Sequence, residues 1–146
     1  MGQAMTPPKR PMMFALPLVG WKEAVSFPKI KLGPIVAKID TGARTSALHA
    51  DEIEVKGRRV RFVIDGRKYA APLTGFRRVK SSNGFSEMRP VIRVTVQLGG
   101  KLMKTEMSLT DRTDMDVPML LGRNSITGLF VVNPGKTFLL TKRPTP

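Results

Sequence analysis

The chain has 146 residues, 41% of them hydrophobic, which is enough to form the core of one domain. It contains no cysteine and a single histidine, His49, which excludes disulfides, thiolate metal sites, a cysteine nucleophile and the usual zinc sites built from several Cys or His ligands. The 25 Lys and Arg residues against 11 Asp and Glu give a net charge of +14, which indicates a polyanionic partner.

The chain alternates short β-rich runs with Gly, Pro and Asn, and no segment keeps a helical period over three turns. Residues 1–13 are predicted to be a flexible lead-in, residues 14–142 the folded domain and residues 143–146 a flexible tail, since both ends carry prolines. The predicted strands are Leu18–Phe27, Ile35–Ile39, Ile53–Val55, Arg59–Ile64, Lys68–Leu73, Phe76–Lys80, Arg89–Leu98, Leu102–Leu109, Leu129–Val132 and Thr137–Leu140.

Three turn signals join these strands into hairpins, namely Asp65-Gly66, Asn83-Gly84 and Gly99-Gly100. The one predicted helix is short and follows Gly122, around Arg123–Thr127. Many short strands with regularly spaced turns are typical of a closed or nearly closed barrel. We therefore predict an all-β protein with a small closed β-barrel and one short helix.

The apolar run Met12–Val19 contains Pro17 and is too short to span a bilayer, and no clear cleavage site follows it. The sequence therefore predicts a cytoplasmic protein without a membrane partner. It has no HExxH pair and no Gly-rich phosphate loop, so we expect neither a metal nor a cofactor.

The positive charge is concentrated in one part of the chain. Between Lys56 and Lys80 nine basic residues stand against the single acid Asp65, and on paired strands they would form a strongly positive face. These residues are Lys56, Arg58, Arg59, Arg61, Arg67, Lys68, Arg77, Arg78 and Lys80.

Asp40-Thr41-Gly42 follows a hydrophobic strand and is the leading candidate for chemistry. An Asp at a strand end presents its carboxylate at a loop, the Thr41 hydroxyl can tie that loop down, and Gly42 allows a close backbone donor. In aspartic peptidases two such carboxylates share a proton and activate a water molecule. The tripeptide alone is also compatible with an ordinary turn.

Six segments in order resemble the bacterial family labelled "ATP-dependent zinc protease", which is retropepsin-like (RimB-like) and associated with RimK-type glutamate ligases. The resemblance covers roughly residues 18–140, but neither "zinc" nor "ATP" in that label finds support in the residues. The segments are VGWKE (Val19–Glu23), KIDTGARTSALHA (Lys38–Ala50), SSNG (Ser81–Gly84), RPVI (Arg89–Ile92), LTDR (Leu109–Arg112) and MLLGR (Met119–Arg123).

The resemblance implies a role for each matching residue. Asp40 corresponds to the catalytic aspartate, and Thr41 and Gly42 to the residues that position it. The hairpin Arg77–Glu87 corresponds to a flap that closes over substrate, with the Asp65-Gly66 hairpin as the alternative. The expected substrate-binding residues are Ala43, Arg44, Arg77, Arg78, Lys80, Ser81, Ser82, Asn83 and Gly84, and those expected to support the site are Leu120, Leu121, Gly122 and Arg123.

One Asp-Thr-Gly per chain implies a homodimer in which two copies of Asp40 meet. Many retroviral members carry an acid four residues after the catalytic Asp, where it pairs with the arginine of the GRN segment, but this chain has Arg44 there. Arg123 would then pair with Asp111, Asp114 or Asp116. A catalytic pair of Asp40 with Asp111 inside one chain is the alternative to the dimer.

The sequence therefore predicts an aspartic peptidase that acts on acidic, glutamate-rich or oligo-glutamate substrates drawn in by the basic residues. The alternative from another class is a non-catalytic basic β-barrel that binds RNA or the ribosome. A third possibility is a retropepsin-like scaffold that folds without cleaving because its dimer does not form.

Overall fold

The computed structural model describes residues 15–80, 83–111 and 116–145. The predicted lead-in over residues 1–13, together with Ser81, Ser82, Arg112 and Asp114, lies outside the described residues.

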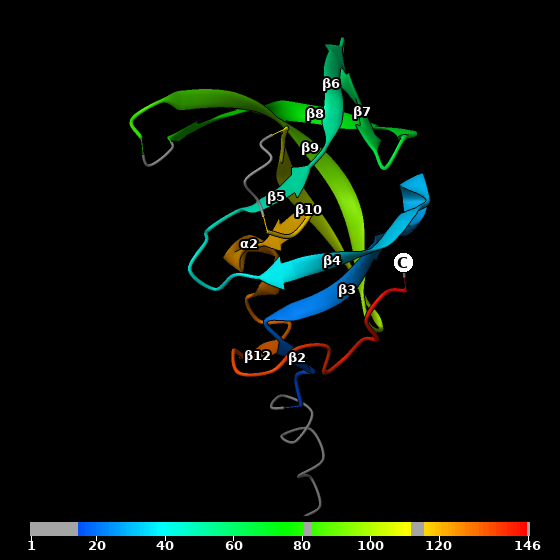
Figure 1. The fold of residues 1–146 in the computed structure, drawn as a ribbon, viewed down its shortest axis with the longest axis vertical. Helices are drawn as coiled ribbons and strands as arrows, with labels where there is room; N and C mark the ends of the chain where they lie inside the picture. Colours follow the sequence, from blue (N-terminus) through cyan, green and yellow to red (C-terminus); the bar gives the residue numbers. More distant parts are fainter. Residues whose placement is uncertain (1–14, 81–82, 112–115, 146) are drawn as a thin grey trace, which may run out of the picture.

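Six strands close into a barrel, as the sequence predicts (Figure 1). The ring closes because β9 pairs with β3 on one side and with β10 on the other. Around the ring the strands are β3 (Lys22–Phe27), β4 (Leu32–Ile39), β11 (Met119–Leu121), β5 (Ser46–His49), β10 (Lys101–Thr110) and β9 (Ser86–Leu98).

The same sheet continues beyond β9 as a wing made of β8 (Arg67–Lys80), β7 (Arg59–Ile64) and β6 (Asp51–Lys56). Figure 1 shows β6 and β7 standing off the upper end of the barrel, while the far halves of β8 and β9 form a long hairpin that projects to the left. The described part also has a second, two-stranded parallel sheet of β2 (Leu18–Gly20) and β12 (Val131–Asn133). The helical elements of the described residues are η1 (Pro28–Ile30) and α2 (Arg123–Ile126), neither of which has the length to cross a membrane.

The core follows from the alternation of side chains along the strands. On β9, Ile92, Val94, Val96 and Leu98 are buried, whereas Arg93 lies between two of them and is exposed. Buried apolar side chains from all six barrel strands form one cluster with those of β7, and Leu48, Met107 and Met119 belong to it.

The three predicted hairpins are confirmed. Asp65-Gly66 joins β7 to β8 with both residues at positive φ, Asn83-Gly84 lies in the β8–β9 hairpin, and Gly99-Gly100 joins β9 to β10. The short helix after Gly122 is also confirmed.

Several predicted strands differ from the structure. Leu18–Phe27 is two strands, because the chain bends at Trp21, and Lys68–Leu73 and Phe76–Lys80 are one strand with a register shift near Gly75. Leu129–Val132 is replaced by β12, and the barrel strands Ser46–His49 and Met119–Leu121 were not predicted.

The prediction of a strand at Thr137–Leu140 is wrong, because the backbone of this region binds a side chain instead of a sheet edge. The buried carboxylate of Glu23 accepts hydrogen bonds from the N–H groups of Leu139 at 2.8 Å, Leu140 at 3.2 Å and Thr141 at 2.9 Å. It also accepts from the Gly20 N–H at 2.7 Å and the Thr141 hydroxyl at 2.6 Å. The Glu23 carboxylate therefore fastens the C-terminal segment to β3.

Burial by itself would raise the pKa of the Glu23 carboxyl, because it disfavours the charged form. The hydrogen bonds from Gly20 and from residues 140–141 outweigh burial and hold this pKa below its ordinary value. At Gly20 a side chain would meet the backbone of Lys136 and Thr137, so the segment VGWKE is explained by the docking of the chain's C-terminal end.

Candidate active site

Asp40 lies directly after β4, at the point where this strand leaves the barrel. Its N–H donates a 2.9 Å hydrogen bond to the carbonyl of Leu121, the last residue of the neighbouring parallel strand β11. The backbone of Asp40 is therefore fixed by the sheet, while its side chain is half-buried at the start of the loop to β5.

The loop after Asp40 turns back on the carboxylate. The Gly42 N–H donates to Asp40 Oδ1 at 3.0 Å, and the Ala43 N–H donates to the Asp40 carbonyl at 3.2 Å. The donation expected from Gly42 is thus present. Thr41 is exposed, and its carbonyl holds the loop by accepting a hydrogen bond from Arg123.

The segment Gly122–Asn124 binds this loop from its other side. The N–H groups of Arg123 and Asn124 donate to the carbonyls of Ala43 and Arg44 at 2.8 and 3.0 Å. At Gly122 a Cβ atom would collide with the backbone of Thr45, so only glycine fits there. Leu120 and Leu121 belong to β11, and Leu121 is buried. The predicted packing of the LLGRN segment beside the Asp-Thr-Gly loop is therefore present.

A buried group of hydroxyls supports this arrangement from below. Ser46 Oγ accepts from the Gly122 N–H at 3.0 Å and lies 2.9 Å from Asn124 Oδ1, to which it donates. Ser125 Oγ lies 3.0 Å from Ser46 Oγ and 2.6 Å from Thr105 Oγ1. Sequence reasoning missed this group, although the paired small hydroxyls of an otherwise apolar strand start, Thr45-Ser46, could have drawn attention to it.

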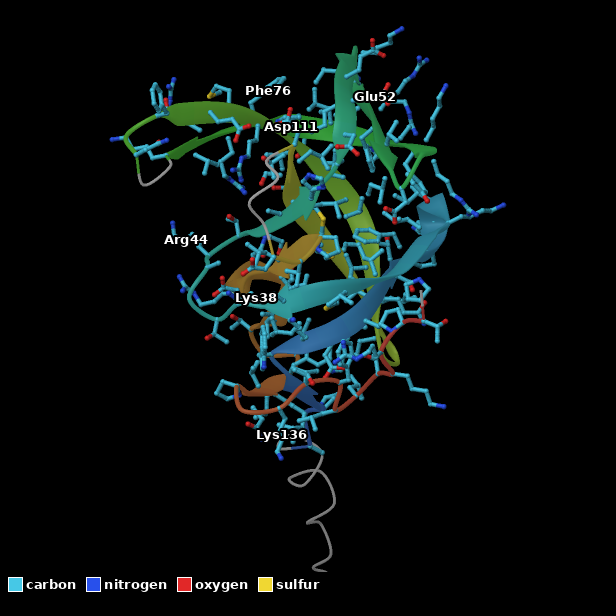
Figure 2. The ribbon with its side chains drawn as sticks, in the orientation of Figure 1. Lys38, Arg44, Glu52, Phe76, Asp111 and Lys136 are labelled. Carbon is cyan, nitrogen blue, oxygen red and sulfur yellow. The ribbon has the colours of Figure 1, made fainter. Side chains whose placement is uncertain are left out.

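Arg123 uses its guanidinium differently from the prediction. Nη1 donates to the carbonyls of Thr41 at 3.1 Å and Gly42 at 3.4 Å. Among the described residues no ion pair involves Arg123, so pairing with Asp111 or Asp116 is wrong for this structure, and Asp114 lies outside the description. Arg44 is exposed on the same loop (Figure 2).

Asp111 lies far from Asp40 along the barrel. Asp111 directly follows Thr110, which pairs with His49 at the end of β5. Asp40 is bound by Leu121, and the preceding residue, Leu120, pairs with Ala47 near the beginning of β5. Since a strand rises about 3.3 Å per residue, the two aspartates are separated by roughly 10 Å or more along β5 alone. Figure 2 likewise shows Asp111 well away from Lys38, two residues before Asp40. The register therefore disfavours a catalytic pair of Asp40 with Asp111 inside one chain.

The β8–β9 hairpin extends on the same side of the molecule as the Asp40 loop (Figure 1). The alternative flap, the Asp65-Gly66 hairpin, lies elsewhere, since Asp65 lines a hollow with Gly33 and Pro34 at the beginning of β4, the opposite end from Asp40. At the tip, Gly84 has a φ of 89° and the Asn83 side chain accepts from the Phe85 N–H. The placement favours the Asn83-Gly84 hairpin as the flap.

The predicted basic lining of this hairpin does not share one face. Along β8 the half-buried residues Arg77 and Val79 alternate with the exposed residues Phe76, Arg78 and Lys80. Arg77 therefore points to one side of the hairpin, and Arg78 and Lys80 to the other. The described residues contain no group of three or more His, Asp or Glu side chains that could hold a metal ion.

The sequence profile of the RimB-like family, described as "Retropepsin-like aspartic endopeptidase RimB", matches residues 18–143. The chain belongs to this family. RimB-like membership agrees with the resemblance found in the motifs and with the closed barrel.

The RimB-like chain also resembles longer proteins named "Probable alpha-L-glutamate ligase". It is 36% identical over 138 residues to the one from Shewanella pealeana, which covers 86% of this chain and 30% of that protein. The corresponding protein of Shewanella halifaxensis is 36% identical over 135 residues, covering 84% and 30%. The chain thus spans about 30% of the length of these relatives.

Among solved structures, the chain is similar to a Legionella pneumophila protein of unknown function, with a TM-score of 0.70 and 29% identity. The similarity covers 85% of this chain and 98% of that one. The RimB-like barrel is therefore shared with a structure of nearly the same extent.

Proposed function

We propose that the protein is an aspartic peptidase whose reactive group is the Asp40 carboxylate. The observation that carries the proposal is the Asp40 loop, in which the backbone is fixed from β11 and from Gly122–Asn124 while the carboxylate itself stays half-buried. A positioned carboxylate with free lone pairs can take a proton from water. The membership in a family described as aspartic endopeptidases supports this chemistry.

The reaction requires a second carboxylate, and the proposed source is Asp40 of a second copy of the chain. Two carboxylates brought close together cannot both ionise, so the pair holds one proton between them. The ionised member removes a proton from the attacking water, and the protonated member donates to the leaving amine. Since Asp111 lies toward the other end of β5, a two-fold pairing supplies the second group more simply.

We propose that the substrates are acidic, either glutamate-rich peptides or glutamate chains on a protein. The net charge of +14 supports attraction of such a substrate. The relatives named as glutamate ligases combine a matching segment with a longer chain, which supports a functional association with glutamate ligation. In this view, one activity would add glutamates and the other would remove them, in the cytoplasm.

The test is hydrolysis of a glutamate-rich peptide by the wild-type protein and by Asp40→Asn. Asparagine keeps Oδ1 as acceptor for the Gly42 N–H but cannot act as a base, so cleavage should fall by about 10²–10⁴-fold. Light scattering of the wild type should show a dimer under the assay conditions. Full activity of Asp40→Asn would disprove the catalytic role, and an active strict monomer would disprove the paired aspartates.

Binding of RNA by the basic wing is the second candidate, and one observation favours it. The basic residues Arg58, Arg59, Arg61, Arg67 and Lys68 are all exposed on the wing. However, Phe62 is buried and stacks on Tyr69 with ring centroids 5.9 Å apart, so Phe62 is not available to stack on bases. A salt-dependent shift with RNA that Asp40→Asn leaves unchanged would support this candidate.

A further inference from the structure

Two arginines face each other across the β8–β9 hairpin. Arg77 on β8 pairs in register with Arg89 on β9. Like charges directly opposite on neighbouring strands are unfavourable, so such a pair needs a compensating anion.

Only one of the two arginines has such an anion among the described residues. Glu87 Oε2 accepts from Arg89 Nε at 2.7 Å, and the Arg89 side chain is only 11% exposed. Arg77 has no ion pair in this part of the chain, and its Nη1 is buried without a hydrogen-bond partner. A buried donor that lacks an acceptor costs free energy, and more so when it is charged. Unlike the exposed Arg78 and Lys80, Arg77 is therefore a cation with a buried donor that has no partner among the described residues.

This cation lies on the face of the hairpin that turns toward the body of the molecule. Arg77, Val79, Glu87 and Arg89 are half-buried, whereas Phe76 and Met88 on the other face are 54% exposed each. Figure 2 shows Phe76 on the upper side of the hairpin, away from Arg44, so Arg77 points the other way.

We propose that Arg77 and Arg89 form a specificity site that binds a side-chain carboxylate of the substrate, and that Glu87 is an internal carboxylate that competes for it. This inference rests on the proposed peptidase function and assigns the selection of acidic residues to two particular side chains. A guanidinium binds a carboxylate through two parallel hydrogen bonds, which supplies both strength and orientation. With a substrate glutamate in place, two arginines and two carboxylates would balance in charge.

The test compares kcat/KM for a glutamate-rich peptide with that for the same peptide carrying glutamine in place of glutamate. Arg77→Gln should lower the Glu/Gln preference by about 10- to 100-fold, mainly through KM, because a charge-assisted contact made with the substrate is lost. Glu87→Gln should raise the same preference, because it frees Arg89 from its internal partner. A purely structural role for Glu87 would lower activity toward both peptides instead.

The chain offers a matched control pair on the outside of β9 and β10. Arg93 Nη2 lies 3.6 Å from Glu106 Oε2, and this pair is exposed. Arg93→Gln and Glu106→Gln make the same changes in net charge as Arg77→Gln and Glu87→Gln, and should leave the preference within about twofold, since exposed charges are screened. If Arg93→Gln lowers the preference as much as Arg77→Gln, general charge explains the selection and the site is wrong.

Two further measurements separate this inference from the proposed function. Arg77→Lys keeps the charge but loses the planar fork, and should recover part of the preference if Arg77→Gln impairs folding. Binding of a fluorescent oligo-glutamate peptide to the Asp40→Asn protein, followed by anisotropy, needs no catalysis. If the wild type cleaves neither peptide, the proposed peptidase function is wrong. The carboxylate-binding site is then supported if Arg77→Gln weakens the binding of the fluorescent peptide by about tenfold or more, and is overturned if it does not. Cleavage with an unchanged preference in Arg77→Gln and Arg77→Lys would overturn the site alone.

Discussion

Two carboxylates of this acid-poor chain, Glu23 and Asp40, occupy opposite kinds of surroundings. Glu23 on β3 is fully buried and accepts hydrogen bonds from Gly20 and from residues 139–141. Asp40 after β4 is half-buried, and among the described residues the Gly42 N–H is its one side-chain donor. The first carboxylate is saturated with donors, whereas the second keeps lone pairs free.

The difference separates a structural acid from a candidate reactive one. A carboxylate whose lone pairs are all occupied has no capacity left to accept a proton from water, and protonating it breaks its hydrogen bonds. At Asp40 the structure fixes the backbone instead, through Leu121, Ala43 and Arg123, and leaves the side chain accessible. The comparison therefore predicts that changes at Glu23 affect stability and changes at Asp40 affect chemistry.

The largest loss of stability is expected for Glu23→Gln. The amide keeps one acceptor oxygen and places an NH₂ group against the donors on the other side. Either the two donors of Thr141 or the N–H groups of Gly20, Leu139 and Leu140 therefore lose their acceptor. At about 1–3 kcal/mol for each unsatisfied group, the free energy of unfolding should fall by about 3 kcal/mol or more. Urea denaturation at a fixed protein concentration measures it, with Asp40→Asn as the isosteric control, expected to change stability by less than about 1 kcal/mol. Equal losses in the two variants would contradict the distinction.

Gly122→Ala should break the support of the Asp40 loop rather than the Asp40 side chain. The added methyl meets the Thr45 backbone, which cannot move without disturbing the bonds to Ala43 and Arg44. Overpacking of this kind costs about 1–3 kcal/mol. Peptidase activity per folded molecule should fall along with stability, because the loop shifts. Gly100→Ala is the control, since a Cβ there meets no atom within 4 Å.

The pH dependence of stability should report Glu23. Because its folded-state pKa lies below the unfolded value, the unfolded state binds more protons, and folding is favoured above the unfolded pKa. This contribution is lost as the pH falls through the folded pKa, at no more than about 1.4 kcal/mol per pH unit. Acid-induced unfolding followed by circular dichroism should show a flatter profile in Glu23→Gln. An unchanged slope in that variant would mean that other carboxyl groups govern acid stability.

The barrel and the Asp40 loop could largely be predicted from the sequence, because the hairpin turns and the Asp-Thr-Gly and LLGRN segments are local sequence patterns. The C-terminal segment was not, since Leu139 and Leu140 look like a strand until the buried Glu23, 116 positions away in the chain, is seen to bind them. Ser46 and Ser125 were missed for the same reason. A contact between side chains 79 positions apart leaves no periodic pattern. The alternation of side chains along β8 predicts that Arg77 and Arg78 lie on opposite faces of that strand. The pairing of Arg77 with Arg89 could not be predicted, because it depends on the register shift near Gly75.

The smallest expected effect on stability belongs to Arg123→Gln. Its guanidinium is exposed and holds the Asp40 loop through the carbonyls of Thr41 and Gly42, so its loss should cost less than about 1 kcal/mol of stability. The backbone bonds of Arg123 and Asn124 to the loop remain, which preserves the fold. Activity should nevertheless fall more than stability, because the two carbonyls flank Gly42, whose N–H donates to the Asp40 carboxylate. A lower kcat in a variant whose urea midpoint equals that of the wild type would establish this. A variant as active as the wild type would show that the backbone hydrogen bonds alone hold the carboxylate in place.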